Sequence, residues 1–170
     1  MKKNSNLGGV ELIMPTTVLT TVDFADTPLA EFGDLINRYA EENLLDPYIV
    51  AAVIMVESSG KPEAYNSMSK ATGLGGIMPR EAGAVFEDRP TIEELKDPEI
   101  NIAWLCKILG YYRNKYHDIE AALYQYSGGS VWPDRKQFKE KYFNRIMGYY
   151  AKYRTAHVDR EPVAEVSTNP

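Results

Sequence analysis

The chain has 170 residues, of which 44% are hydrophobic and 25% are charged, as in an ordinary soluble globular domain. This length suffices for one domain with a substantial core. The formal net charge of -5 at pH 7 argues against a nucleic-acid-binding protein that works through a general basic field.

Cysteine and histidine limit the possible chemistry. The one cysteine, Cys106, excludes an intrachain disulfide, and its apolar surroundings favour a core position over a nucleophile. The two histidines, His117 and His157, lie far apart in polar segments. We therefore expect neither a histidine-rich metal site nor a catalytic triad.

No apolar stretch is long enough to predict a membrane span. Near the N-terminus, Lys2 and Lys3 precede an aliphatic run over residues 7–19, but Glu11 and Pro15 interrupt it and no clean cleavage site follows. We therefore predict no secretory signal and synthesis in the cytoplasm.

The two ends of the chain lack helical periodicity. Residues 1–26 are predicted to form an N-terminal arm, either extended or packed down, in which the β-branched residues 16–22 could form a strand without an obvious partner. Residues 156–170 are polar and are predicted to be a disordered tail.

Between these ends, helix starts share one pattern, a capping residue beside a proline. Thr27-Pro28, Asp46-Pro47 and Asp97-Pro98 predict helices to about 43, 57 and 116, and Asp118 predicts a helix to 126. A short helix is expected over 80–86 within a loop-rich stretch, and a last helix after Pro133-Asp134 carries an apolar stripe of Phe138, Tyr142, Ile146 and Tyr149. The fold class is therefore predicted as all-α, with one domain over residues 27–155.

The segment 48–56 contains no charge and no strongly polar group, and Glu57-Ser-Ser-Gly follows it. A helix that is apolar all round is buried on every side. An acid at its C-terminal end faces the negative end of the helix dipole and apolar neighbours, which should both raise its pKa. Glu57 is thus a candidate general acid. On this segment alone, the alternative that it is merely the first solvated residue after a core helix stays open.

Two later segments allow a functional or a structural interpretation. Residues 73–79, Gly-Leu-Gly-Gly-Ile-Met-Pro, let a ligand or another segment approach the backbone closely, but they lack the preceding strand and the lysine of a phosphate loop. Residues 121–129 form a small-residue helix that ends in Tyr126-Ser-Gly-Gly. Its tyrosine is either a core residue at a helix end or a hydroxyl that reaches a partner.

Four motifs follow one another in the chain: Glu-Ser-Ser-Gly at 57–60, Gly-Leu-x-x-Ile-Met-Pro at 73–79, Asp-Pro-x-x-Asn-Ile at 97–102 and Ala-Leu-x-x-Tyr-x-x-Gly at 122–129. In this order they resemble the lytic transglycosylase (SLT, goose-lysozyme-like) domain. The resemblance runs from about residue 46 to 153. It implies a lysozyme-like α-helical fold around a central buried helix and a glycan-binding groove. It also implies cleavage of the β-1,4 bond between N-acetylmuramic acid and N-acetylglucosamine in peptidoglycan, without a metal or cofactor.

Residue by residue, the resemblance implies that Glu57 is the single catalytic acid and that Tyr126 approaches it, orienting either Glu57 or an N-acetyl group. Asn101 is implied to be structural, and Pro79 helps to wall the groove. The residues implied to bind substrate are Ser67, Gly73, Ile77, Met78, Tyr126 and Ser127.

Several positions depart from the family pattern. Gly75 and Gly76 stand where Met and Gln are usual, Ser127 replaces an Asn, and Lys70 replaces a Gly. The spacing from the acid to Gly-Leu is also one residue longer. These departures mark a divergent member and leave open a weaker or shifted contact with sugar.

Most glycosidases use two carboxylates, but the nearest later acids, Glu63, Glu81 and Asp88, lie in polar segments. A one-acid mechanism that closes a 1,6-anhydro ring fits better. A hydrolytic muramidase acting on the same bond, and a non-catalytic glycan-binding or structural protein, remain the alternatives. Because no export signal is predicted, we expect the protein to reach peptidoglycan from a virion or through a secretion machine.

Overall fold

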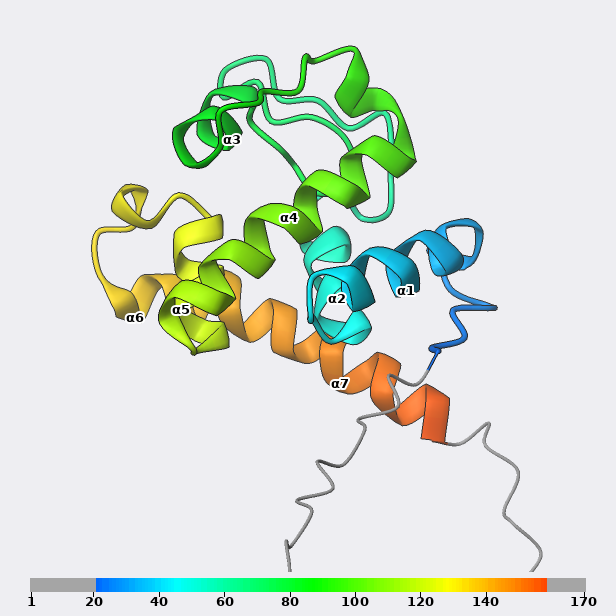
Figure 1. Cartoon of the computed structure of the whole chain (residues 1–170). Helices are drawn as coiled ribbons and strands as arrows, with labels where there is room; N and C mark the ends of the chain where they lie inside the picture. Colours follow the sequence, from blue (N-terminus) through cyan, green and yellow to red (C-terminus); the bar gives the residue numbers. More distant parts are fainter. Residues whose placement is uncertain (1–20, 159–170) are drawn as a thin grey trace, which may run out of the picture.

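The computed structural model describes residues 21–158, with no description of the side chains of residues 81, 83, 84, 157 and 158. Seven α-helices make up most of this part: α1 (Gly33–Glu42), α2 (Pro47–Glu57), α3 (Pro79–Val85), α4 (Pro98–Tyr116), α5 (Ile119–Tyr126), α6 (Arg135–Phe138) and α7 (Asn144–Val158) (Figure 1). Short 3-10 helices are η1 (Ala30–Phe32), η2 (Glu94–Lys96) and η3 (Gly129–Val131), and a π-helical turn, η4 (Lys139–Phe143), joins α6 to α7.

No extended strand occurs within residues 21–158, so the all-α fold class is confirmed. Two isolated antiparallel bridges, Tyr65 with Thr72 and Thr72 with Ile77, fold the loop between α2 and α3 back on itself. In Figure 1 this loop and α3 lie above α4, while α5 and α6 lie toward its lower left end.

The predicted aspartate caps begin the helices. In each case the side chain accepts a hydrogen bond from a backbone N–H two or three residues later, which satisfies a donor of the first turn. The pairs are Asp46 with Tyr48, Asp97 with Ile100, Asp118 with Ala121 and Asp134 with Gln137.

The first helix starts later than predicted. The Thr27 hydroxyl donates to the carbonyl oxygen of Phe24 and accepts from the amide of Leu29, which closes a turn instead of starting an α-helix. The chain then passes through η1 before α1 begins at Gly33. This bend buries the side chains of Leu29 and Phe32 completely or almost completely.

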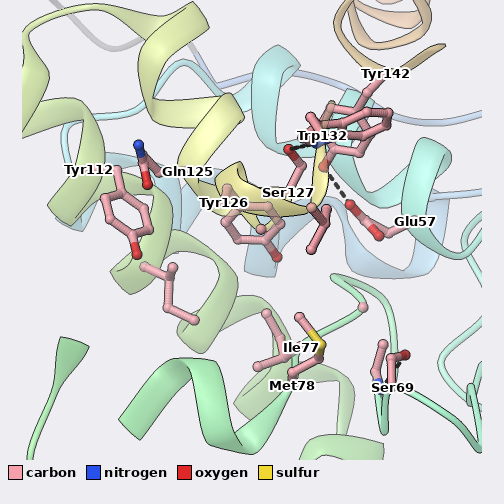
Figure 2. A pocket seen from close by; sticks show the side chains of 15 residues that line it. Glu57, Ser69, Ile77, Met78, Tyr112, Gln125, Tyr126, Ser127, Trp132 and Tyr142 are labelled. Atoms are coloured by element: carbon pink, nitrogen blue, oxygen red, sulfur yellow. Dashed lines mark hydrogen bonds between the residues drawn. The ribbon is translucent and has the colours of Figure 1, made fainter. Parts of the chain in front are cut away.

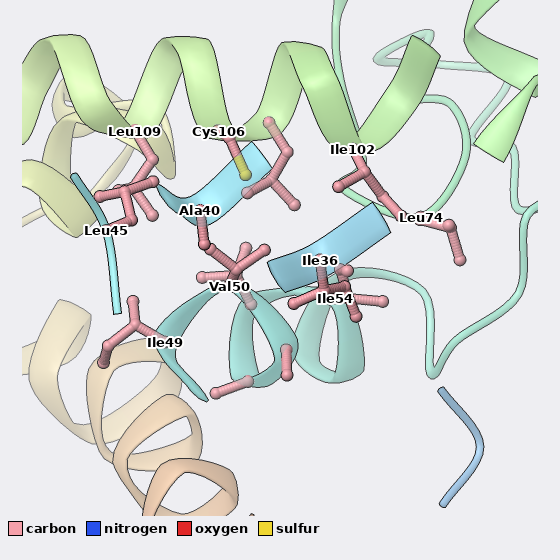
Figure 3. Packing of buried hydrophobic residues seen from close by; sticks show 14 of the residues in the cluster. Ile36, Ala40, Leu45, Ile49, Val50, Ile54, Leu74, Ile102, Cys106 and Leu109 are labelled. Carbon is pink, nitrogen blue, oxygen red and sulfur yellow. The ribbon is translucent and has the colours of Figure 1, made fainter. Parts of the chain in front are cut away.

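Helix α2 lies at the centre of the core, as its apolar sequence predicts. All residues from Ile49 to Met55 are buried, and α2 packs against α1 and α7. Figure 3 shows side chains of α1, α2 and α4 meeting in one cluster, which includes Ile54 and Ile102. Cys106 lies in this cluster, and burial raises the pKa of its thiol, so its prediction as a core residue is confirmed.

Packed residues also lie outside the range 27–155. Val22 and Phe24 are buried, and the Asn37 side chain exchanges two hydrogen bonds with the backbone of Val22. The ring of Phe24 meets the ring of Tyr153 edge-on, and α7 continues to Val158. The predictions for residues 1–20, including most of the 16–22 strand, and for 159–170 lie outside the described residues; Thr21 and Val22 form no strand.

Within residues 21–158, none of the helices combines the length and the apolar character that crossing a membrane would require.

Candidate active site

Glu57 is the last residue of α2 and is only partly exposed. The helix stops there because Ser59 and Gly60 adopt positive φ angles of 57° and 78°. The buried hydroxyl of Ser58 donates a hydrogen bond to the carbonyl oxygen of Ile54, 3.1 Å away, in the last turn of α2. The predicted helix stop after Glu57 is therefore confirmed, and it leaves the carboxyl group at the edge of the core.

The surroundings of Glu57 hold its proton near neutral pH. Burial is the main effect and raises the pKa of Glu57 from 4.5 to about 7, because the charged form loses hydration. A hydrogen bond from Tyr142 and the positive charge of Arg145 lower the pKa, but they do not offset the burial. A carboxyl with a pKa close to the working pH can both donate and accept a proton.

The hydroxyl of Tyr142 donates a short hydrogen bond to Oε1 of Glu57 (Figure 2). Tyr142 lies in the π-helical turn η4, and such turns are frequent at functional sites. Trp132 packs beside it, with the two ring centroids 6.1 Å apart. The sequence placed Tyr142 in the apolar stripe of the last helix and did not predict its hydrogen bond to Glu57. The signal that could have revealed it was the hydroxyl in a buried stripe, because a buried tyrosine hydroxyl needs a hydrogen-bond partner.

The glycine-rich loop is held against the site from two sides. Asn101 is fully buried; its Nδ2 donates to the carbonyl oxygens of Thr72 and Leu95 at 2.9 and 2.8 Å, and its Oδ1 accepts from the amide of Gly75 at 2.7 Å. The Tyr126 hydroxyl donates to the carbonyl oxygen of Gly75 at 2.7 Å. Tyr126 thus supports the loop, and the hydroxyl bonded to Glu57 belongs to Tyr142.

Gly75 and Gly76 leave no room for side chains. A Cβ on Gly76, whose φ is +59°, would lie 2.7 Å from Oε2 of Glu57. A Cβ on Gly75 would lie 2.8 Å from Cδ1 of Leu105 and 2.9 Å from the hydroxyl of Tyr126. The Met and Gln of the family pattern therefore do not fit this backbone, and the two glycines let the loop approach the carboxyl group.

Glu57 borders two hollows in the surface. The aromatic hollow has a volume of about 320 Å³, and its walls include Tyr112, Tyr126, Trp132 and Tyr142. The polar hollow has a volume of about 360 Å³, and its walls include Tyr65, Asn66 and Gly73. Both are also lined by Glu57, Ser69, Ala71 and Gly76. Among the described residues that line either hollow, Glu57 is the only acid.

Most of the predicted substrate-binding residues line these hollows. Ile77, Met78, Tyr126 and Ser127 line the aromatic hollow (Figure 2), and Gly73 lines the polar one. The Ser127 hydroxyl accepts a 2.8 Å hydrogen bond from the indole N–H of Trp132. Ser127 thereby fixes the orientation of an aromatic wall.

Ser67 is exposed and lines neither hollow, whereas Ser69 lines both. The side chain of Asn66 accepts from the amides of Met68 and Ser69, and the amide of Lys70 donates to the Asn66 carbonyl oxygen. This tight turn, with Lys70 at a φ of +64°, leaves the Met68 side chain 94% exposed. The serine that lines the hollows thus lies two positions later in the chain than the motif predicts.

No group of three or more His, Cys, Asp or Glu residues is arranged to hold a metal ion in the part of the chain that the structure describes.

Comparison with known proteins identifies the family. The transglycosylase SLT domain model matches residues 34–147, which is more than half of the chain. The membrane-bound lytic murein transglycosylase E of Buchnera aphidicola (Acyrthosiphon pisum) is 34% identical over 98 residues, which cover 54% of this chain and 44% of that relative. A transglycosylase of Enterobacteria phage PRD1 is 34% identical over 59% of this chain and 36% of its own length.

The membrane-bound lytic murein transglycosylase C of Edwardsiella ictaluri is 30% identical over 68% of this chain and 33% of its own length. The chain thus spans less than half the length of each of these relatives. The matched region 34–147 contains α2 with Glu57, the glycine-rich loop, α4, α5 and Tyr142. With these motifs in one matched region, the chain belongs to the transglycosylase SLT domain family.

Proposed function

We propose that the protein is a peptidoglycan lytic transglycosylase, which cleaves the β-1,4 bond between N-acetylmuramic acid and N-acetylglucosamine and leaves 1,6-anhydro ends. The observation that carries this proposal is Glu57. It is a partly exposed carboxyl with a pKa of about 7, and it is the only acid among the described residues that line the two hollows. Membership of the family and the names of the relatives support the same activity.

In the first step Glu57 acts as a general acid. Its Oε1 accepts the hydrogen bond from Tyr142, so the proton resides on Oε2, the oxygen that lies over Gly76. With a pKa of about 7, roughly half of the molecules carry this proton at neutral pH. The proton passes to the glycosidic oxygen, and the bond from that oxygen to C1 of the muramoyl residue breaks.

In the second step the same group acts as a base. The Glu57 carboxylate takes the proton from the muramoyl 6-hydroxyl, whose oxygen then bonds to C1 and closes the anhydro ring. The Tyr142 hydroxyl and the charge of Arg145 stabilise the carboxylate between the steps. Proton transfer of this kind contributes about 10²–10⁴-fold to the rate, and the groove supplies the remainder through orientation.

We assign the glycan to both hollows, with the cleaved bond at Glu57. Aromatic walls suit the apolar faces of sugar rings, and Tyr126 and Trp132 supply them on one side. Ile77 and Met78 form the opposite wall, and Ser69 takes the place predicted for Ser67.

The test is digestion of purified peptidoglycan, followed by mass spectrometry of the products. We expect 1,6-anhydro ends from the wild-type protein and no products from Glu57→Gln. Glu63→Gln is the matched control, because Glu63 is exposed and lines neither hollow. Reducing ends would instead establish a hydrolytic muramidase. A biological effect that survives Glu57→Gln would establish a non-catalytic glycan-binding protein.

We also propose that the catalytic domain extends beyond 27–155 to include Val22 and all of α7, because Val22 packs into the core. The similarity to a phage transglycosylase supports delivery of the protein as part of a virion, with residues 1–20 and 159–170 as attachment segments. Detection of the protein in purified virions tests this, and its absence from them would favour a secretion machine.

A further inference from the structure

The side chain of Gln125 projects into the aromatic hollow from the last turn of α5. Figure 2 shows Gln125 and Tyr112 on the far side of Tyr126 from Glu57. The aromatic hollow is also lined by Ile108, which is buried, and by Val131, which is 72% exposed. A carboxamide therefore lies in a mainly aromatic and aliphatic setting.

The amide of Gln125 makes no hydrogen bond or ion pair with another of the described residues. Its two N–H donors and its carbonyl acceptor are thus available to a ligand. The chain's other glutamine, Gln137, is already engaged, because it accepts from the ammonium group of Lys141.

The backbone around Gln125 leaves space for its amide. A Cβ on Gly129, whose φ is +41°, would lie 3.1 Å from Oε1 of Gln125. A larger residue at this position would press against the amide.

Among the described residues that line the hollows, the other amide belongs to Asn66. Its Oδ1 already accepts from the amides of Met68 and Ser69. At the two amide positions expected from the family pattern stand Gly76, which has no side chain, and Ser127, which carries a hydroxyl. Gln125 is therefore the side-chain amide that a sugar in the aromatic hollow can meet.

We propose that Gln125 binds the acetamido group of a sugar in the aromatic hollow and makes this part of the groove selective for N-acetylated hexosamines. The inference rests on the proposed function, since it takes the ligand to be a glycan strand. The Gln125 N–H donates to the acetamido carbonyl, and its Oε1 accepts from the acetamido N–H, while the acetamido methyl group packs against Ile108. A free amino sugar has no carbonyl to accept the first bond, and its charge would lose hydration among aromatic walls.

The test measures binding, so that it does not depend on cleavage. Full-length Glu57→Gln protein is titrated by calorimetry with a tetramer of N-acetylglucosamine and, separately, with a tetramer of glucosamine. Loss of two neutral hydrogen bonds in Gln125→Ala should weaken binding of the N-acetylated tetramer about tenfold. Binding of the glucosamine tetramer should not change.

Two further variants separate recognition from folding. Gln125→Glu keeps the size of the side chain but replaces the N–H donors with a negative charge. It should therefore weaken binding of the N-acetylglucosamine tetramer and strengthen binding of the cationic glucosamine tetramer. Gln137→Ala, the matched control outside both hollows, should bind both tetramers as the parent does.

The inference would be overturned if Gln125→Ala weakened binding of both tetramers equally, or of neither. It would also be overturned if Gln125→Glu left the preference for the N-acetylated tetramer over the glucosamine tetramer unchanged. The proposed function is decided separately by whether the wild-type protein cleaves peptidoglycan. A protein that cleaves it but shows no such preference would therefore refute the role of Gln125 alone.

Discussion

Replacement of Glu57 by Gln should stabilise the protein at pH 8 and have much less effect at pH 5. In the folded state burial raises the pKa of Glu57 to about 7, whereas the ordinary value is 4.5. At a pH between 4.5 and about 7, the folded protein holds a proton on Glu57 that the unfolded chain has released. The free energy of unfolding therefore falls as the pH rises through this range, and a neutral glutamine removes that loss.

The magnitude follows from the difference between the two pKa values. At about 1.4 kcal/mol per pH unit, values of 4.5 and about 7 give a stabilisation of about 3 kcal/mol at pH 8. At pH 5 the same two pKa values give a stabilisation by Glu57→Gln of only about 0.8 kcal/mol. Since Glu57 is partly exposed, about 3 kcal/mol is an upper value.

Urea unfolding of the wild type and of Glu57→Gln, followed by circular dichroism from pH 5 to pH 8, measures this difference. Other groups that titrate in both proteins cancel in the comparison. Glu63→Gln provides the control, because Glu63 is an exposed carboxyl in the loop that follows α2. A stabilisation by Glu57→Gln that is equal at pH 5 and pH 8 would refute the raised pKa and, with it, the general-acid role.

Three further substitutions test the surroundings of Glu57, and a fourth, Gly148→Ala in α7, serves as a comparison for the glycine variant. Tyr142→Phe removes the hydrogen-bond donor to Oε1 of Glu57, so the pKa of Glu57 should rise further. The falling limb of kcat/KM against pH should therefore move to higher pH, and the activity should fall about tenfold. An unchanged pH profile would contradict the contact between Tyr142 and Glu57. Gly76→Ala puts a Cβ 2.7 Å from Oε2 at a φ of +59° and should cost about 1–3 kcal/mol in urea unfolding, together with most of the activity. Gly148→Ala, with nothing within 4 Å of its Cβ, should instead stabilise α7 by about 0.5–1 kcal/mol. Asn101→Ala removes the partner of the Gly75 amide and of the Leu95 carbonyl oxygen, while the Thr72 carbonyl oxygen keeps its hydrogen bond from the amide of Ile77. This variant should cost about 2–4 kcal/mol, and a smaller loss would mean that water replaces the Asn101 amide.

The helices could be predicted because their signals are local. The carboxylate of Asp97 bonds an amide three residues away, and the seven consecutive buried residues of α2 follow from an uninterrupted apolar run. Glu57 became a candidate general acid in the same way, from its position directly after that run. The late start of α1 was missed because the Thr27 hydroxyl closes a turn with Phe24, which an apolar stripe does not reveal.

The partners of Glu57 come from distant parts of the chain. Tyr142 lies 85 residues from Glu57 and reaches it only because α7 packs against α2 and a π-helical turn precedes α7. Tyr126 lies 51 residues from Gly75, and the motif alone did not reveal that its hydroxyl bonds the loop.

The choice between Ser67 and Ser69 depends on the turn around Asn66 and on the positive φ of Lys70. The sequence by itself determined the helices, the buried α2 and the acid at its end, because hydrogen bonds to near neighbours and apolar periodicity lie within one segment. Only the tertiary structure decided which hydroxyl holds that acid and which side chains line the groove. Those contacts join segments far apart in the chain, and their geometry depends on how whole helices pack.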